Sequence, residues 1–154
     1  MQQKWRKIMD KNTVVIAIDH GWSNMKTVHE TFTSGIREIT TEPALFENVL
    51  EKDGKYYKVG SERLKVKDSK VEDENYYLLS LAATAKELDR LGRRNANVYW
   101  AVGLPLIRFG KEKEAFIKYL RASCRRTLWN SLASTTSTAG QQTLENRPRH
   151  WSLR

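Results

Sequence analysis

Short apolar runs alternate with turn-prone residues along the first 120 positions of the chain. Val14–Ile18 is fully apolar and largely β-branched, which is typical of a strand buried on both faces of an α/β sheet. Strand character resumes over Met25–Phe32, and Ser34-Gly35 predicts a hairpin turn before a third strand at Ile36–Thr41. The opening of the chain therefore predicts a meander of three strands joined by tight turns.

The pattern changes at Pro43, which ends the meander. Ala44–Leu50 predicts a further strand, and Asp53-Gly54 is a strong signal for a two-residue hairpin turn before a strand at Tyr56–Gly60. The charged, weakly patterned stretch from Lys65 to Asp73 is interpreted as an exposed connection.

The later part of the pattern predicts a helix, a strand and a second helix. Acidic residues at Glu72–Glu74 and a glycine at Gly92 are typical of a helix start and end. Between them, apolar residues recur at helical spacing, at Leu78, Leu81, Ala85 and Leu88. Val98–Val102 predicts a second buried strand, and Lys111–Leu120 predicts a helix after Gly110. A meander followed by helix, strand and helix indicates an α/β fold.

The positive charge is concentrated in the last 34 residues, which differ in composition from the rest. Met1–Leu120 carries 21 Lys and Arg against 17 Asp and Glu, whereas Arg121–Arg154 carries six Arg, no Lys and one Glu. Ten of those last residues are Ser or Thr. We interpret 1–120 as the folded domain and 121–154 as a basic, poorly ordered tail that arose by a frameshift, a cloning scar or terminal divergence, and we favour the frameshift.

Cysteine usage and hydropathy indicate the cellular compartment in which the protein is expected. Cys124 is the single cysteine, so it supports neither an intrachain disulfide nor a cysteine-based metal site. The apolar run Val14–Ile18 is too short for a secretory h-region, and no stretch reaches the roughly 18 apolar residues of a membrane span. We expect a cytoplasmic protein that does not contact a membrane.

The turn after the first predicted strand carries the clearest candidate chemistry. If it receives a nucleoside triphosphate, Gly21 lets the backbone take a positive φ and come close to an anion. Main-chain N–H groups around Trp22, Ser23 and Asn24 would form a concave anion-binding nest, and the Ser23 hydroxyl would be a further donor. This turn is therefore our candidate phosphate-binding loop.

Charged residues flank the turn on both sides. Lys26 would supply positive charge to the β- or γ-phosphate. Asp19 would hold Mg²⁺ through water, because Mg²⁺ gives up its hydration reluctantly. As an isolated pattern, Asp-x-Gly-x-x-x-x-Lys is met equally well by an ordinary strand–turn–strand hairpin, so its surroundings have to distinguish the two interpretations.

Those surroundings resemble one known superfamily. An apolar strand that ends in Ile18–Thr27 and leads into a meander is similar to the phosphate-1 hairpin of actins, heat-shock chaperones and sugar kinases. Gly54–Arg63, the strand and loop Trp100–Leu106, and the helix beginning at Lys111–Phe116 follow in the order seen in bacterial actin-like proteins of the ParM/StbA plasmid-segregation type. The resemblance covers about residues 1–120.

This resemblance implies the fold and function that we expect. The fold would be a ribonuclease H-like, actin-like ATPase subdomain, truncated, with ATP and Mg²⁺ as ligands. The intact family form would polymerise into filaments for plasmid segregation, with copies of itself and a DNA-bound adaptor protein as partners, and without direct sequence-specific DNA binding. The later family motifs that position the attacking water, the second phosphate loop and the adenosine pocket cannot be assigned, so catalytic residues stay unknown and we expect this short form to be inactive.

Two alternatives remain open at this stage. One keeps the superfamily and makes the chain part of a sugar-kinase-like or chaperone-like ATPase. The other is a small non-enzymatic α/β protein whose basic residues at 121–154 bind nucleic acid through the phosphate backbone.

Overall fold

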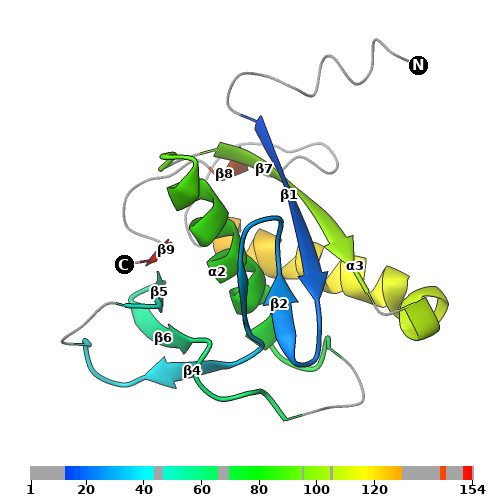
Figure 1. Cartoon of the computed structure of the whole chain (residues 1–154), viewed down its shortest axis with the longest axis horizontal. Helices are drawn as coiled ribbons and strands as arrows, with labels where there is room; N and C mark the ends of the chain where they lie inside the picture. The colour runs from blue at the N-terminus through cyan, green and yellow to red at the C-terminus, as the bar shows by residue number, and fades with distance from the viewer. Residues whose placement is uncertain are drawn as a thin grey trace.

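The structure, a computed structural model, describes residues 13–43, 47–65, 70–94, 96–104, 106–129, 143–144 and 151–153. Within these ranges the chain forms two β-sheets and two helices, labelled as in Figure 1. In chain order they are β1 Thr13–His20, β2 Asn24–Lys26, β3 Thr31–Thr33, β4 Ile36–Ile39, β5 Val49–Lys52, β6 Lys55–Val59, α2 Asn75–Arg90, β7 Ala96–Gly103, α3 Leu106–Trp129, β8 Thr143–Leu144 and β9 Trp151–Leu153.

The first sheet, with strand order β3-β2-β1-β7-β8, is built around two parallel strands. β1 and β7 pair in parallel from Thr13 opposite Asn97 to Asp19 opposite Gly103, and β2 turns back antiparallel beside β1. Helix α2 lies between β1 and β7 in the chain, as a parallel crossover requires. The predicted α/β fold class is confirmed.

The second sheet, with strand order β4-β6-β5-β9, contains the predicted Asp53-Gly54 hairpin. Asp53 has a φ of 52° and Gly54 a φ of 75°, as a two-residue turn with a right-handed strand twist requires. β5 begins at Val49, so the strand predicted at Ala44–Leu50 is confirmed for its last two residues and is wrong for residues 47 and 48, which form a turn. Residues 44–46 lie outside the described residues.

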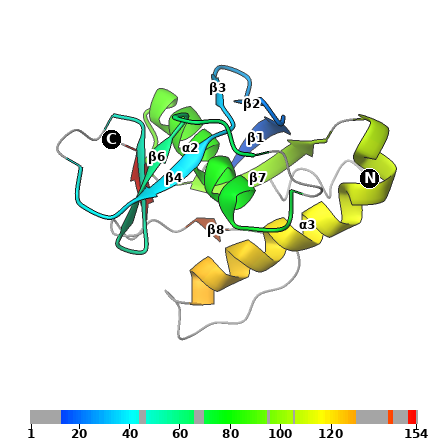
Figure 2. The same cartoon turned by 90° about the horizontal axis from the view of Figure 1, so that it is seen from below.

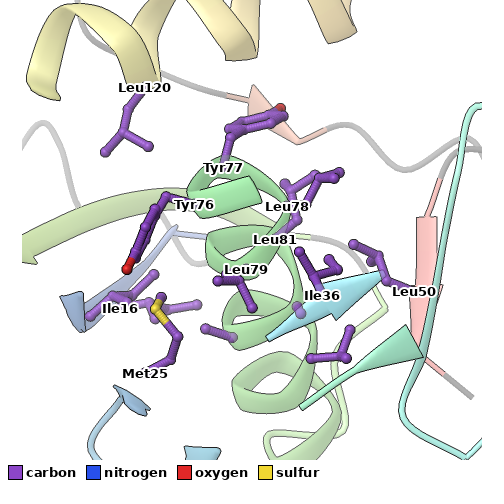
Figure 3. Packing of buried hydrophobic residues seen from close by; sticks show 14 of the residues in the cluster. Ile16, Met25, Ile36, Leu50, Tyr76, Tyr77, Leu78, Leu79, Leu81 and Leu120 are labelled. Carbon is purple, nitrogen blue, oxygen red and sulfur yellow. The ribbon is translucent and has the colours of Figure 1, made fainter. Parts of the chain in front are cut away.

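Helix α2 lies at the centre of the molecule and is buried nearly all round. Its apolar side chains contact both sheets and α3, as the sticks in Figure 3 show, and Figure 2 shows the backbone of the helix between β4 and β1. Leu79 and Leu81 are 0% and 1% exposed, although they lie on different sides of the helix. Gly92 ends the helix with a φ of 63°, and the N–H groups of Gly92 and Arg93 donate to the carbonyls of Asp89 and Leu88. The predicted helix end is confirmed.

The two helices cover one face of the first sheet, and the strands reflect this. Burial alternates along β1, with Ile16, Ile18 and His20 facing α2, whereas Val15 is 60% exposed. The prediction that this strand is buried on both faces is therefore wrong for the described residues. An apolar run shows that a strand suits burial, but the partner for its second face is a property of the tertiary structure.

The predicted three-strand meander is wrong in its details. Met25–Phe32 is not one strand but β2, a turn and β3, because Thr27 and Glu30 hydrogen-bond to each other within the turn. Ser34-Gly35 does not close a hairpin. It carries the chain from the first sheet to the second, where Ile36–Ile39 pairs with β6 as strand β4. A side chain at Gly35 would overlap the carbonyl of Glu62, so glycine is required there.

Helix α3 is longer than predicted at both ends. It runs from Leu106 to Trp129, so Gly110 lies inside the helix and not before it. Phe116, Leu120 and Ser123 are buried, which ties the helix to the core on both sides of the expected boundary at residue 120. The segment 121–154 also contributes β8 and β9, and its other residues beyond Trp129 lie outside the described residues. None of the helices that the structure describes is long and apolar enough to cross a membrane.

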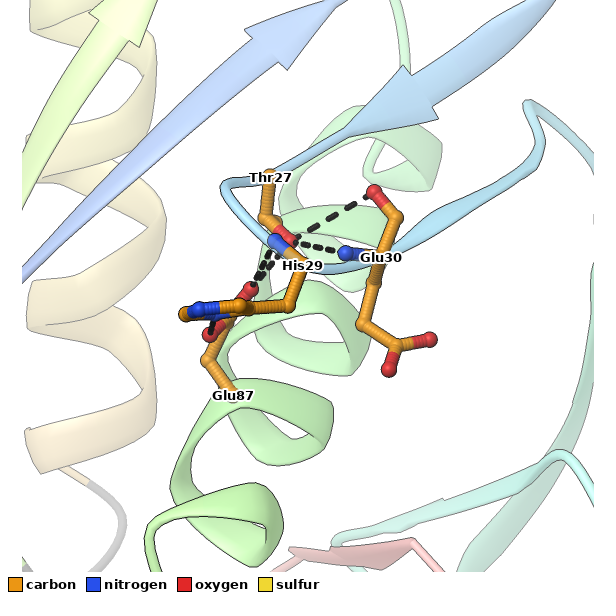
Figure 4. A network of polar contacts seen from close by, with 4 residues as sticks. All are labelled: Thr27, His29, Glu30 and Glu87. Atoms are coloured by element: carbon orange, nitrogen blue, oxygen red, sulfur yellow. Dashed lines mark hydrogen bonds and ion pairs between the residues drawn. The ribbon is translucent and has the colours of Figure 1, made fainter.

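A buried carboxylate fixes the β2–β3 turn onto α2, as Figure 4 shows. Glu87 is 6% exposed and accepts hydrogen bonds from the Thr27 hydroxyl, from the main-chain N–H of His29 at 3.1 Å and from the His29 ring at 2.8 Å. Burial raises the pKa of Glu87, but the hydrogen bonds from Thr27 and His29 outweigh it and hold this pKa below its ordinary value of 4.5. The turn is thus anchored by an ionised group.

We predict that Glu87→Gln destabilises the chain by about 1–3 kcal/mol at neutral pH, because it weakens charge-assisted hydrogen bonds inside the protein. Since folding lowers the pKa of Glu87, its contribution is complete above pH 4.5 and is lost as the pH falls through the folded-state value. Urea unfolding of both proteins at several pH values should show the difference shrinking in acid. Asp89→Asn, an exposed change on the same helix, is the control. A difference independent of pH would contradict this role for the carboxylate.

Candidate functional site

The candidate phosphate-binding loop lies where the two parallel strands end. Residues 21–23 connect β1 to β2, and Asp19 on β1 is opposite Lys26 on β2. The carboxyl ends of β1 and β7 meet at this same edge, because Asp19 is also opposite Gly103. Ligands of α/β sheets bind outside the carboxyl ends of the parallel strands, so the loop has the position that such a site requires.

The charged candidates lie on the face of the sheet that α2 and α3 do not cover. Asp19 and Lys26 are both exposed, and as a directly opposed pair on neighbouring strands their side chains emerge side by side. The carboxylate lies against the end of β7, since a Cβ at Gly103 would be in van der Waals contact with Asp19 Oδ1 at 3.4 Å. The structure therefore brings a carboxylate and an ammonium to one corner of the sheet next to the loop.

The loop is held by its carbonyl groups. The Gly21 carbonyl accepts hydrogen bonds from the Ser34 hydroxyl at 2.8 Å and from the Tyr76 hydroxyl at 3.4 Å. The Ser23 carbonyl accepts one from the main-chain N–H of Ser34 at 2.9 Å. In a trans peptide the C=O of one residue and the N–H of the next point in opposite directions. The N–H groups of Trp22 and Asn24 consequently point away from Ser34, as donors of an anion site must.

The role assigned to Gly21 needs correction. The glycines with a positive φ within the described residues are Gly54, Gly60 and Gly92, so Gly21 does not use the left-handed conformation. Glycine is required at this position for a steric reason, because a Cβ at Gly21 would overlap the carbonyl oxygen of Asn24. The tightness of the turn, and not the sign of φ, excludes a side chain there.

A neutral histidine lies beneath the loop. His20 is fully buried, and its Nε2 is 2.8 Å from the Ser80 hydroxyl, which itself donates to the Tyr76 carbonyl at 2.7 Å. Since the serine proton is used in that bond, His20 Nε2–H is the donor to Ser80. Burial, together with the positive charge of Lys70, lowers the pKa of His20 to about 3. His20 therefore serves the packing of the loop as an uncharged side chain, also in edge contact with the Phe116 ring at 4.9 Å.

Three supporting residues are not identified from the sequence. Ser34 looks like a turn residue, Tyr76 looks like ordinary helix packing, and Lys70 falls in a stretch interpreted as an exposed connection, yet Lys70 is only 3% exposed. Each contacts a part of the loop or its flanking strand that is 11 to 55 residues away along the chain. Sequence spacing carries no signal for such contacts.

Mg²⁺ binding at Asp19 stays a prediction. Within the part of the chain that the structure describes, no three His, Cys, Asp or Glu side chains gather as direct ligands. A water-mediated site does not need such a group, because Mg²⁺ keeps most of its water and takes one or two carboxylates together with phosphate oxygens. Asp19, exposed beside the loop, is placed for that type of contact.

The fold of this chain is similar to that of a solved ParM structure. Neither a protein-family model nor a curated protein matches the chain. Among solved structures, the crystal structure of apo pSK41 ParM matches 71% of this chain with a TM-score of 0.51 at 20% sequence identity. That likeness shows the fold and confirms the expected actin-like architecture. The chain spans 42% of the length of pSK41 ParM.

We predict that Gly21→Ala destabilises the chain by about 1–3 kcal/mol, because the added methyl group forces the loop apart at the Asn24 carbonyl. The matched control is Gly110→Ala in α3, where a Cβ meets nothing within 4 Å and where alanine should raise stability by up to about 1 kcal/mol. Urea unfolding of the three proteins measures both effects. Equal stability of the two variants would show that the loop is less tight than described.

Proposed function

We propose that this chain is the N-terminal part of a bacterial actin-like ATPase and that the hairpin from Asp19 to Lys26 binds the phosphates of ATP together with Mg²⁺. The observation that carries this proposal is the geometry of that hairpin. Its loop carbonyls are hydrogen-bonded inward at the carboxyl edge of two parallel strands, beside an opposed aspartate and lysine. The likeness to the fold of pSK41 ParM supports the same assignment.

In this proposal each group has one task. Main-chain N–H groups at Gly21, Trp22, Ser23 and Asn24 and the Ser23 hydroxyl bind phosphate oxygens, and Lys26 neutralises their charge. Asp19 would hold a hydrated Mg²⁺, which would offset part of the negative charge of the phosphates. The exposure of Asp19 and Lys26 supports these tasks, since both side chains can reach a ligand outside the sheet edge.

The proposal extends to the intact family form. There, ATP binding would support assembly into filaments that segregate plasmid DNA in the cytoplasm, with further copies of the protein and a DNA-bound adaptor as partners. Because the chain spans 42% of pSK41 ParM, we assign these activities to the intact form and not to this chain alone.

We predict that ATP·Mg shifts the backbone amide NMR signals of residues 21–24 in the full chain and that Lys26→Ala weakens the binding at least about fivefold, since one charge-assisted contact is lost. Titration followed by ¹H–¹⁵N spectra measures both. The control, Lys118→Ala, removes the same charge from an exposed position on α3. Binding that is equally strong in Lys26→Ala, or shifts confined to other parts of the chain, would reject the assignment.

We also predict that the chain on its own releases no phosphate from ATP above background. Phosphoryl transfer depends on charged and polar groups positioned around the γ-phosphate, and the hairpin approaches it from one side. Phosphate release by the wild-type chain should equal that by Lys26→Ala under saturating ATP·Mg. A rate that is higher in the wild type and abolished by the substitution would show that this chain already contains a catalytic site.

A further inference from the structure

Lys70 is a buried lysine next to the candidate phosphate-binding loop. Its side chain is 3% exposed, and its ammonium group donates a hydrogen bond to the carbonyl of His20, the last residue of β1. The same nitrogen lies 4.8 Å from the centre of the Trp22 ring and 5.1 Å from the centre of the Tyr76 ring. One cation thus contacts the end of a strand, the loop and helix α2.

These contacts are of a kind that stabilises a charged lysine inside a protein. Lysine is rarely buried, because its ammonium group loses its hydration. The faces of two aromatic rings and a main-chain carbonyl replace part of that hydration. The Trp22 and Tyr76 rings also contact each other edge to face, with centres 6.0 Å apart.

We propose that Lys70 is the positioning residue of the phosphate-binding loop: it fixes the orientation of the loop amides and places positive charge on the inner side of the anion site. The proposal rests on the proposed function, because it assigns a task at that same site. Nothing in the sequence pattern around Lys70 indicates it.

The orientation of the loop amides follows from the geometry of the trans peptide bond. Since the His20 carbonyl points to Lys70, the N–H of Gly21 in the same trans peptide points away from it. The Gly21 and Ser23 carbonyls are held by Tyr76 and Ser34 on the same inner side. The hydrogen bonds to these three carbonyls therefore fix the orientation of three peptide planes. In each plane the N–H group of the following residue points away from the protein interior.

The residues beneath the loop determine the charge on the inner side of the anion site. The ring of His20 is neutral, and the positive charge of Lys70 is one of the reasons, after burial, that the pKa of His20 falls to about 3. Among the described residues that contact the loop, Lys70 supplies a positive charge beneath it. A fixed cation behind amide donors favours an anion in front of them.

The test uses the full chain with two substitutions of graded effect. Lys70→Met keeps much of the volume and removes both charge and donor, whereas Lys70→Gln removes the charge and keeps an N–H donor. Lys65→Met, at an exposed position five residues earlier, is the control. Thermal unfolding establishes that each protein is folded, and Lys70→Gln replaces Lys70→Met if the latter fails to fold.

Two readouts need no ligand. In Lys70→Met the amide signals of Gly21 and Trp22 should shift and their hydrogen exchange should speed up, and in both Lys70 variants the pKa of His20, followed by its ring ¹H signals, should rise. A residue that only fills space would not move the His20 titration. Unchanged loop amides together with an unchanged His20 pKa would overturn the proposal.

A third readout uses pyrophosphate and ATP·Mg as probes. Lys70→Met should bind both about tenfold more weakly than the wild type, with Lys70→Gln between them and Lys65→Met unchanged. Equal affinity in Lys70→Met would overturn the proposal. If the wild type binds neither probe, the proposed function fails, and the ligand-free readouts still decide whether Lys70 positions the loop.

Discussion

The placement of α2 on the first sheet depends on a stripe of polar groups that runs along the helix through the core. Each is paired with a different part of the sheet: the Ser80 hydroxyl with His20 of β1, the Thr84 hydroxyl with Trp100 of β7, and Glu87 with the β2–β3 turn. A buried polar group without a partner costs roughly 1–3 kcal/mol. Sliding the helix by one turn would break all three pairs together, so the stripe fixes the position of the helix where apolar packing alone would tolerate a shift.

Because α2 is fixed in this way, the elements that it contacts are fixed too. Tyr76, one turn before Ser80, carries the hydroxyl that reaches the Gly21 carbonyl and the ring that faces Lys70. The same helix therefore holds the β2–β3 turn with its last turns and the candidate phosphate-binding loop with its first. The loop owes its shape to the core, and not only to its own turn residues.

The sequence was informative wherever the signal is local. The type I′ turn at Asp53-Gly54, the glycine end of α2 at Gly92 and the apolar strands β1 and β7 follow from residue types within a few positions. The hairpin from Asp19 to Lys26 was predicted for the same reason. The contacts that the sequence pattern did not predict join residues far apart in the chain. They are the hydrogen bond from Thr27 to Glu87, the close approach of the Glu62 carbonyl to Gly35, and the hydrogen bond from Lys70 to the His20 carbonyl. No periodicity within a window of ten residues encodes those pairs.

The charge distribution bears on how such a site would attract an anion. Met1–Leu120 carries 21 basic and 17 acidic residues, so the net charge of +9 owes more to residues 121–154 than to residues 1–120. A general positive field therefore explains little at the loop, and local arrangement has to supply the attraction. Amides whose peptide planes are already fixed need no reorganisation when a phosphate arrives, and a site of this kind loses less free energy on binding than a loop that must first order itself. The inward anchoring of the loop carbonyls is for this reason the feature of the fold that matters most for phosphate binding.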